Sequence, residues 1–365
     1  MRACWLAAVL MIALQGVASA APATTDTPPP PSRILAIPPE LRQAFRQAVN
    51  DRSTAPQVRL DLMMRFLFEG EGGLGMTYDH AATHTVEEAY RTRKANCLTF
   101  TLLSLALARE AGLDAQAQQI DEVLSWRQEN MHLVRSNHVN TGLRVQQRRY
   151  TIDVASNEIL TRAPPRAIGD AALLALYYSN RAMELAIEGH YTAAVPYMSA
   201  SLALDPDSAH GLNNAGVVAL RSGDAATAEA HYRAALEREP EHWGALANLS
   251  HLYERLGDVA RARPLRQRSD RVLARDPFHQ FIVGHQAESA GDPATAAARY
   301  RRAIRLHSGE HRFHSALART LLQQGDTAGA IKALTAARRL ADAEGGARYQ
   351  AKLDRLRTAG ATPRR

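Results

Sequence analysis

Cys97, His138 and Asp153 are the residues whose types and order could carry nucleophilic chemistry. A cysteine thiolate attacks an acyl carbon, a histidine takes and returns the proton, and an aspartate fixes the histidine tautomer and stabilises its cationic form. The three residues therefore predict a cysteine-dependent site for acyl transfer or amide hydrolysis, provided that the fold brings them together.

A helix is expected to carry the cysteine. Asn96 can cap the helix start, the apolar run from Leu98 to Leu107 predicts a buried helix, and Gly112 closes it. Cys97 then lies in the first turn, where unpaired N–H groups and the helix dipole favour a thiolate. Its backbone N–H could supply half of an oxyanion hole.

Two strands are expected to carry the other two residues. Apolar and polar residues alternate over residues 138–145 and again over residues 150–154, with a polar turn at 146–149. A turn centred between Gln147 and Arg148 places Asp153 opposite Gly142, about 13 Å from His138 along a flat strand. Contact then requires strong twist or a bulge at Gly142. Two alternatives stay open, namely that His132 is the base or that the site is vestigial.

These segments resemble the transglutaminase-like superfamily, a papain-related fold. The matching pieces are Ala95-Asn96-Cys97-Leu98-Thr99-Phe100, Asn137-His138-Val139-Asn140 and Thr151-Ile152-Asp153-Val154. The resemblance covers roughly residues 34–156. It implies an α+β domain over residues 34–165, with Cys97, His138 and Asp153 as the catalytic triad.

The first residues predict export. Arg2, an apolar stretch from Trp5 to Leu14 and the small residues before Ala21 have the pattern of a signal peptide over residues 1–20. The protein is therefore expected in the periplasm or secreted. Cys97 would be its one remaining cysteine, and an unpaired cysteine in an oxidising compartment favours a catalytic role. Residues 21–33 are rich in proline and predict a disordered linker.

Two other patterns near the cysteine are weaker. His80 and His84 stand four apart, but the segment is expected to be a loop and offers no third metal ligand at a supporting distance. The glycine-rich residues 69–75 lack the Gly-Lys-Ser/Thr ending of a phosphate-binding loop. The sequence therefore predicts neither a metal nor a cofactor.

The second half of the chain repeats with a period of 34 residues. Glycine recurs at each step, and alanine recurs five residues after every glycine; the glycines are Gly189, Gly223, Gly257, Gly291 and Gly325, and the alanines are Ala194, Ala228, Ala262, Ala296 and Ala330. The pattern resembles tetratricopeptide (TPR) repeats, five of them over residues 170–342, with a capping helix at 343–358. It implies an all-α solenoid whose groove binds a protein or peptide ligand. Inward-facing candidates are His210, Asn213, His251 and Glu254.

Composition sets limits on the partners. The net charge of +7 comes almost wholly from arginines interspersed with acids, so no basic block indicates nucleic-acid binding. No apolar run after the signal peptide predicts a membrane span. We therefore expect an exported transglutaminase-like cysteine domain joined to a protein-binding TPR module. The alternative is a catalytically inactive periplasmic TPR scaffold.

Overall fold

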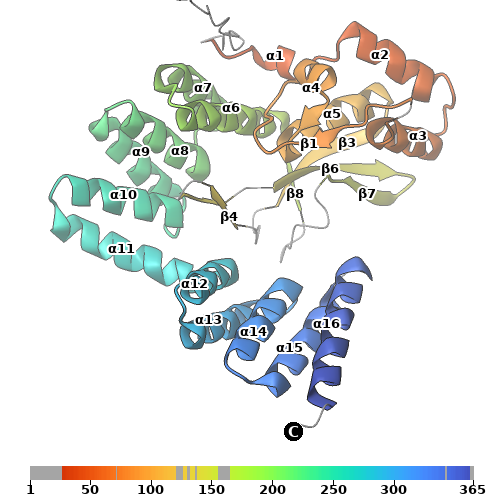
Figure 1. The fold of residues 1–365 in the computed structure, drawn as a ribbon. Helices are drawn as coiled ribbons and strands as arrows, with labels where there is room; N and C mark the ends of the chain where they lie inside the picture. Colours follow the sequence, from red (N-terminus) through yellow and green to blue (C-terminus); the bar gives the residue numbers. More distant parts are fainter. Residues whose placement is uncertain are drawn as a thin grey trace, which may run out of the picture.

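The computed structural model describes residues 27–70, 72–120, 126–129, 132–135, 138–154, 165–341 and 343–361. Figure 1 shows an N-terminal part that contains helices and strands, followed by an arc of antiparallel helices that ends at the C-terminus. None of the helices among these residues is long and apolar enough to cross a membrane. The expected signal peptide lies outside the described residues.

Helices form most of the N-terminal part before the main sheet. They are α1 (Pro31–Ile34), α2 (Pro39–Phe45), the π-helical turn η1 (Arg46–Asn50), α3 (Pro56–Phe68), α4 (Val86–Thr92) and α5 (Cys97–Glu110). The helix α4 begins with a capping box, in which Thr85 and Glu88 bind each other's backbone N–H groups. The helix α1 begins within residues 21–33, the proline-rich segment expected to be disordered, and the Tyr178 hydroxyl donates to the carbonyl of Pro29 at 2.5 Å.

A four-stranded antiparallel sheet packs against α5, in the order β7-β6-β3-β8. Its strands are β3 (Asp114–Ile120), β6 (His138–Val145), β7 (Arg148–Ile152) and β8 (Arg166–Ile168). Two short pairs lie outside this sheet: β1 (Thr77–Tyr78) with β2 (Lys94–Ala95), and β4 (Trp126–Glu129) with β5 (His132–Arg135).

Five helix pairs follow, and they form the arc in Figure 1. The pairs are α6 (Asp170–Ile187) with α7 (Tyr191–Leu204), α8 (Ala209–Arg221) with α9 (Ala225–Arg238), α10 (Trp243–Arg255) with α11 (Val259–Leu273), α12 (Pro277–Ser289) with α13 (Pro293–Leu306), and α14 (His311–Gln323) with α15 (Thr327–Leu340). The helix α16 (Ala343–Ala361) packs on α15 and ends the array.

The recurring glycine and alanine explain why the pairs are alike. Each of the five glycines turns the chain between two helices with φ between 78° and 92°, a conformation that suits glycine. Each of the five alanines is at most 1% exposed, because its small side chain lets the second helix of a pair approach the first. The expected solenoid of helix pairs is therefore present.

One core joins the two parts of the molecule. Buried apolar residues of α5 and the sheet belong to the same cluster as buried residues of α6, α7 and α8. At the surface, the Arg109 guanidinium near the end of α5 binds the Asp170 carboxylate at the start of α6 through two hydrogen bonds of 2.7 and 2.8 Å. The first repeat is thus packed directly against the helix that carries Cys97.

Candidate functional site

His138 and Asp153 are in direct contact. The ring Nε2 of His138 lies 2.7 Å from Oδ2 of Asp153, and both side chains are largely buried, 3% and 10% exposed. His138 begins β6, and Asp153 directly follows β7. A buried carboxylate at this distance fixes the ring orientation and stabilises the imidazolium form.

The hairpin register differs from the one expected from the sequence. The two-residue turn is Gln146-Gln147, and Thr141 pairs with Ile152, so Asp153 lies next to Asn140 and not opposite Gly142. The offset between His138 and Asp153 is therefore only two residues along the strand. Continuous pairing on both sides of β6 shows that no bulge is needed at Gly142.

Cys97 completes the contact on the other side of the imidazole. The thiol is half-buried, and it lies close enough to the imidazole to help raise the pKa of His138. Because Asp153 occupies Nε2, the ring nitrogen that remains for Cys97 is Nδ1. Burial lowers the pKa of His138, but the hydrogen bonds to Asp153 and Cys97 and the charges of both residues outweigh it and raise this pKa to about 9.

Buried hydroxyl groups align the cysteine helix with β6. Thr101 lies one helical turn after Cys97 and donates to the carbonyl oxygens of Cys97 at 2.8 Å and Val139 at 3.1 Å. One turn further on, the hydroxyl groups of Ser104 and Thr141 are 2.8 Å apart. These contacts fix the position of α5 along β6. Cys97 therefore lies near the start of this strand, where His138 is found.

The helix start has the cap that the sequence predicts. The side chain of Asn96 accepts a hydrogen bond from the Thr99 N–H at 2.9 Å, and its Nδ2 donates to Thr83 Oγ1 at 2.8 Å. The N–H groups of Cys97 and Leu98 are the first two of the helix and have no acceptor within it. They can stabilise negative charge that develops next to the sulfur.

Asn140 is a further polar residue of this site, and the sequence reasoning missed its contact. It is 2% exposed, and its Nδ2 donates to Asp153 Oδ2 at 3.3 Å, the same oxygen that contacts His138. Strand alternation could have revealed it, because residues 138 and 140 point to the same face. Gly142 also has a role here: a Cβ at this position would lie 2.3 Å from Nε2 of Gln118, so the glycine makes room for that side chain.

The two weaker histidine candidates have ordinary surroundings. The exposed His80 ring packs edge-on against the Tyr78 ring, and the His84 backbone N–H donates to Thr99 Oγ1 at 2.8 Å. In the described segments, neither histidine belongs to a group of three potential metal ligands. The side chain of His132, the alternative base, lies outside what the structure describes.

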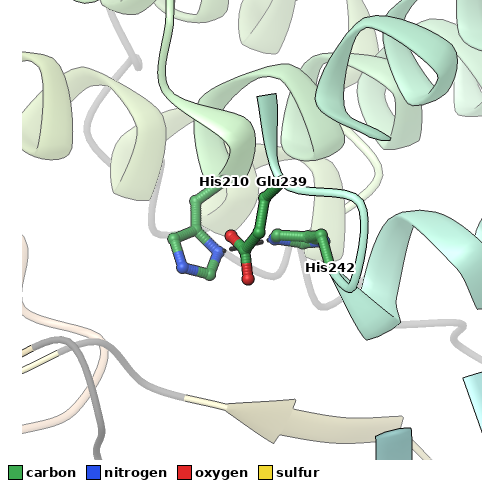
Figure 2. Close-up of side chains that lie close together, drawn as sticks. All are labelled: His210, Glu239 and His242. Carbon is green, nitrogen blue, oxygen red and sulfur yellow. Dashed lines mark hydrogen bonds between the residues drawn. The ribbon is translucent and has the colours of Figure 1, made fainter. Parts of the chain in front are cut away.

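A second polar cluster joins the second and third repeats (Figure 2). His210, Glu239 and His242 each offer an atom that could bind a metal, and these atoms lie within 4.8 Å of one another. His242 caps α10, since its Nδ1 accepts the Ala245 N–H at 3.0 Å. A neutral imidazole that accepts at Nδ1 carries its proton on Nε2, which here lies 2.8 Å from Nδ1 of His210.

This hydrogen-bond pattern conflicts with metal binding by His242. A neutral imidazole that ligates a metal through Nε2 carries its proton on Nδ1, where it would meet the Ala245 N–H. The helix cap and a metal bond therefore exclude each other at His242. We assign the pair His210 and His242 as a hydrogen-bonded link between repeats.

Asparagines connect the first helices of successive repeats in a similar way. Asn214 donates to Ser179 Oγ at 3.0 Å, and Asn248 donates to Asn213 Oδ1 at 2.9 Å. Hydrogen bonding between neighbouring repeats therefore explains why asparagine occurs at these positions. These contacts do not form a clamp for a ligand carboxylate.

Comparisons with known proteins identify the type of repeat that the helix pairs form. Two family models, both described as tetratricopeptide repeat, match residues 219–276, and residues 179–234 together with 284–344. The helix pairs are thus TPR repeats, a class of protein-interaction module. No curated protein matches the sequence.

Several solved structures resemble the chain over about half its length. One is YrrB, described as a TPR protein with an unusual peptide-binding site, with 20% identity over 46% of this chain and 86% of that one and a TM-score of 0.26. Another is the TPR protein TTC0263 of Thermus thermophilus, with 22% identity, coverage of 49% and 98%, and a TM-score of 0.27. A third is PilF of Pseudomonas aeruginosa, with 18% identity, coverage of 52% and 94%, and a TM-score of 0.28.

Proposed function

We propose that Cys97, His138 and Asp153 form a cysteine acyl-transfer or amide-hydrolysing site in a transglutaminase-like domain. The TPR repeats would hold the protein or peptide on which this site acts. The observation that supports the proposal is the position of His138, whose ring lies 2.7 Å from Asp153 and close enough to Cys97 for the cysteine to raise the His138 pKa. This is the connectivity of a nucleophile, a base and an orienting acid.

In the proposed mechanism each of the three residues has its own role. The thiolate of Cys97 attacks the acyl carbon, and the first N–H groups of α5 bind the oxygen that becomes negative. His138, whose pKa near 9 keeps it cationic at neutral pH, gives its proton to the leaving amine. The neutral imidazole then takes a proton from water or from an amine, which attacks the thioester and releases Cys97. Asp153 holds the ring through its contact with Nε2.

The thiol reactivity of Cys97 tests the proposal. We expect iodoacetamide to label the peptide that contains Cys97 rapidly near neutral pH, and His138→Asn to slow this labelling at least tenfold. A Cys97→Ser protein controls for other nucleophiles. His251→Asn, at an exposed position in the repeats, is the matched control and should not change the rate. Equal rates in wild type and His138→Asn would contradict the role of His138.

The second candidate function is a TPR scaffold whose cysteine domain has no catalytic activity. It is supported by the comparisons, since both family models match the repeats and neither extends to the region of Cys97. This candidate predicts slow labelling of Cys97 that His138→Asn leaves unchanged. In that case a pull-down with the repeats would be the next experiment.

We also propose that the protein is exported. The proposal rests on the signal-peptide pattern of residues 1–20 and on the single cysteine that cleavage would leave. Fractionation of cells that produce the full chain tests it: the mature protein should begin at Ala21 and appear outside the cytoplasm. A full-length protein in the cytoplasm would contradict it.

A further inference from the structure

The helix α11 is the least buried second helix of the repeats. Only Ala262 and Ser269 are buried among its 15 residues, whereas α13 buries four of 14. The repeat register explains part of this difference. Arg266 stands where the neighbouring repeats have Tyr232 and Tyr300, and its guanidinium lies at the surface, 3.0 Å from Glu254.

Two adjacent clefts lie along α11. The larger, of about 610 Å³, lies between α9 and α11 over α10, and the smaller, of about 220 Å³, lies toward the end of α11. Both include Arg268. We call the two together the arginine cleft, and its basic residues are Arg233, Arg261, Arg268, Arg271 and Arg275.

The charges of the arginine cleft are not balanced. Five arginines face two glutamates, Glu237 and Glu241. Arg261 is held by Asp258 and Glu229, but within the described residues Arg233, Arg271 and Arg275 form no ion pair. All five are exposed. Three arginines are therefore available to an anionic partner without breaking an existing ion pair.

The floor of the cleft is apolar. It includes Leu236, Leu249, Pro264 and Leu265. Its aromatic residue, Tyr253, is 5% exposed, with its hydroxyl on Glu229 at 2.7 Å and the Arg261 guanidinium over its ring at 4.1 Å. No open aromatic face is thus offered for stacking of a nucleic-acid base, and leucine side chains suit a partner with apolar groups.

We propose that the arginine cleft binds an acidic peptide segment that carries apolar side chains. Carboxylates of the segment would pair with Arg233, Arg271 and Arg275, and its apolar side chains would cover the leucines. A second copy of this chain is a poor occupant, because its net charge is +7. The cleft lies between second helices of repeats, so it is distinct from the inner residues His210, Asn213 and His251 on first helices. The proposal does not depend on Cys97.

Fluorescence anisotropy with a labelled peptide of glutamate and leucine tests the proposal. The full chain should bind it, and added salt should weaken the binding. The double variant Arg233→Glu/Arg271→Glu should bind at least tenfold more weakly. Arg301→Glu/Arg305→Glu on α13 makes the same charge change at two exposed positions and should have less than a threefold effect.

Other outcomes would overturn the proposal. Equal weakening in the two double variants would indicate only general charge attraction. No binding of the peptide by the wild-type chain, or tighter binding of a single-stranded oligonucleotide of the same charge, would exclude an acidic peptide as the preferred ligand. A leucine-free peptide of glutamate and serine should bind more weakly, and equal affinity would show that the apolar floor has no role.

Discussion

The Thr83 hydroxyl lies next to the Glu184 carboxyl of the first repeat and opposes the increase in pKa that burial causes there. The same hydroxyl oxygen accepts from Nδ2 of Asn96, the cap of the cysteine helix, at 2.8 Å. Burial raises the pKa of Glu184, while the contacts with Thr83 and Arg181 oppose this shift. Thr83 therefore lies between the first repeat and the turn that presents Cys97.

Thr83→Val should destabilise the protein more than a hydroxyl deletion at the surface. The variant keeps the shape but leaves the buried Asn96 Nδ2 without its hydrogen-bond partner, which costs about 1–3 kcal/mol of unfolding free energy. Urea unfolding of the two proteins measures the difference. Thr77→Val is the matched control, because Thr77 donates to the Arg93 carbonyl from an exposed position. An equal loss in both variants would contradict the linking role of Thr83.

Asp153→Asn should destabilise the protein in a pH-dependent way. The pKa of His138 is raised from 6.5 to about 9 in the folded protein, so the imidazolium stabilises the fold fully below pH 6.5. This contribution is lost as the pH rises through 9. We expect a difference in unfolding free energy on the order of 2 kcal/mol at the lower end of the range, and less above pH 9.

Denaturant unfolding between about pH 6 and about pH 10 measures this profile, because the raised pKa of His138 lies within that range. The matched control is Asp61→Asn, whose carboxylate is exposed and accepts only from the nearby Gln57 at 3.3 Å among the described contacts. Its effect should not change with pH. A pH-independent loss in Asp153→Asn would show that the carboxylate does not set the His138 pKa.

The hydroxyl pair Ser104 and Thr141 should behave as a coupled unit. Their oxygens are 2.8 Å apart and buried between α5 and β6. Ser104→Ala or Thr141→Val alone leaves a polar partner behind, whereas the double variant removes both. We expect the double variant to lose about 0.5–1.5 kcal/mol less than the two single losses combined. Strictly additive losses, measured by urea unfolding, would argue against direct coupling.

The helical repeats could be predicted from the regular spacing of their glycines and alanines. The turn between β6 and β7 could not be predicted in this way. The five repeat glycines all adopt positive φ, as their spacing predicts. In contrast, the hairpin turn places Gln146 and Gln147 at φ of 48° and 67°, and neither residue is a usual signal for such a turn. The predicted register was therefore wrong, and the separation of His138 and Asp153 was overestimated.

The burial of His138 also depends on more than its own strand. A polar residue on an alternating strand usually faces solvent, yet His138 is 3% exposed. The residues that surround it lie at the start of α5 and directly after β7. Local sequence does not fix the distance from His138 to either of them. The order of Cys97, His138 and Asp153 indicated the site, but their contacts required the tertiary structure.

Gly216→Ala should destabilise the second repeat, although alanine favours helix more than glycine. A Cβ at Gly216 would lie 2.4 Å from the ring of Tyr232, which is 1% exposed and cannot move outward without disturbing the core. Such overpacking costs about 1–3 kcal/mol, against a gain in helix propensity of about 1 kcal/mol. Thermal unfolding should show a lower midpoint.

A smaller partner side chain should reverse this loss. In a protein that carries Tyr232→Leu, the methyl group added by Gly216→Ala has space. In that background Gly216→Ala should leave the stability unchanged or increase it. Gly346→Ala in α16 is the control for helix propensity, because the nearest atom to its Cβ would be 3.7 Å away. The pair Gly284 and Tyr300 has the same geometry two repeats later, with 2.7 Å from the Cβ to the ring. If Gly216→Ala were equally destabilising with Tyr232 and with Leu at position 232, the close approach of helix and ring would not be the reason for glycine at this position.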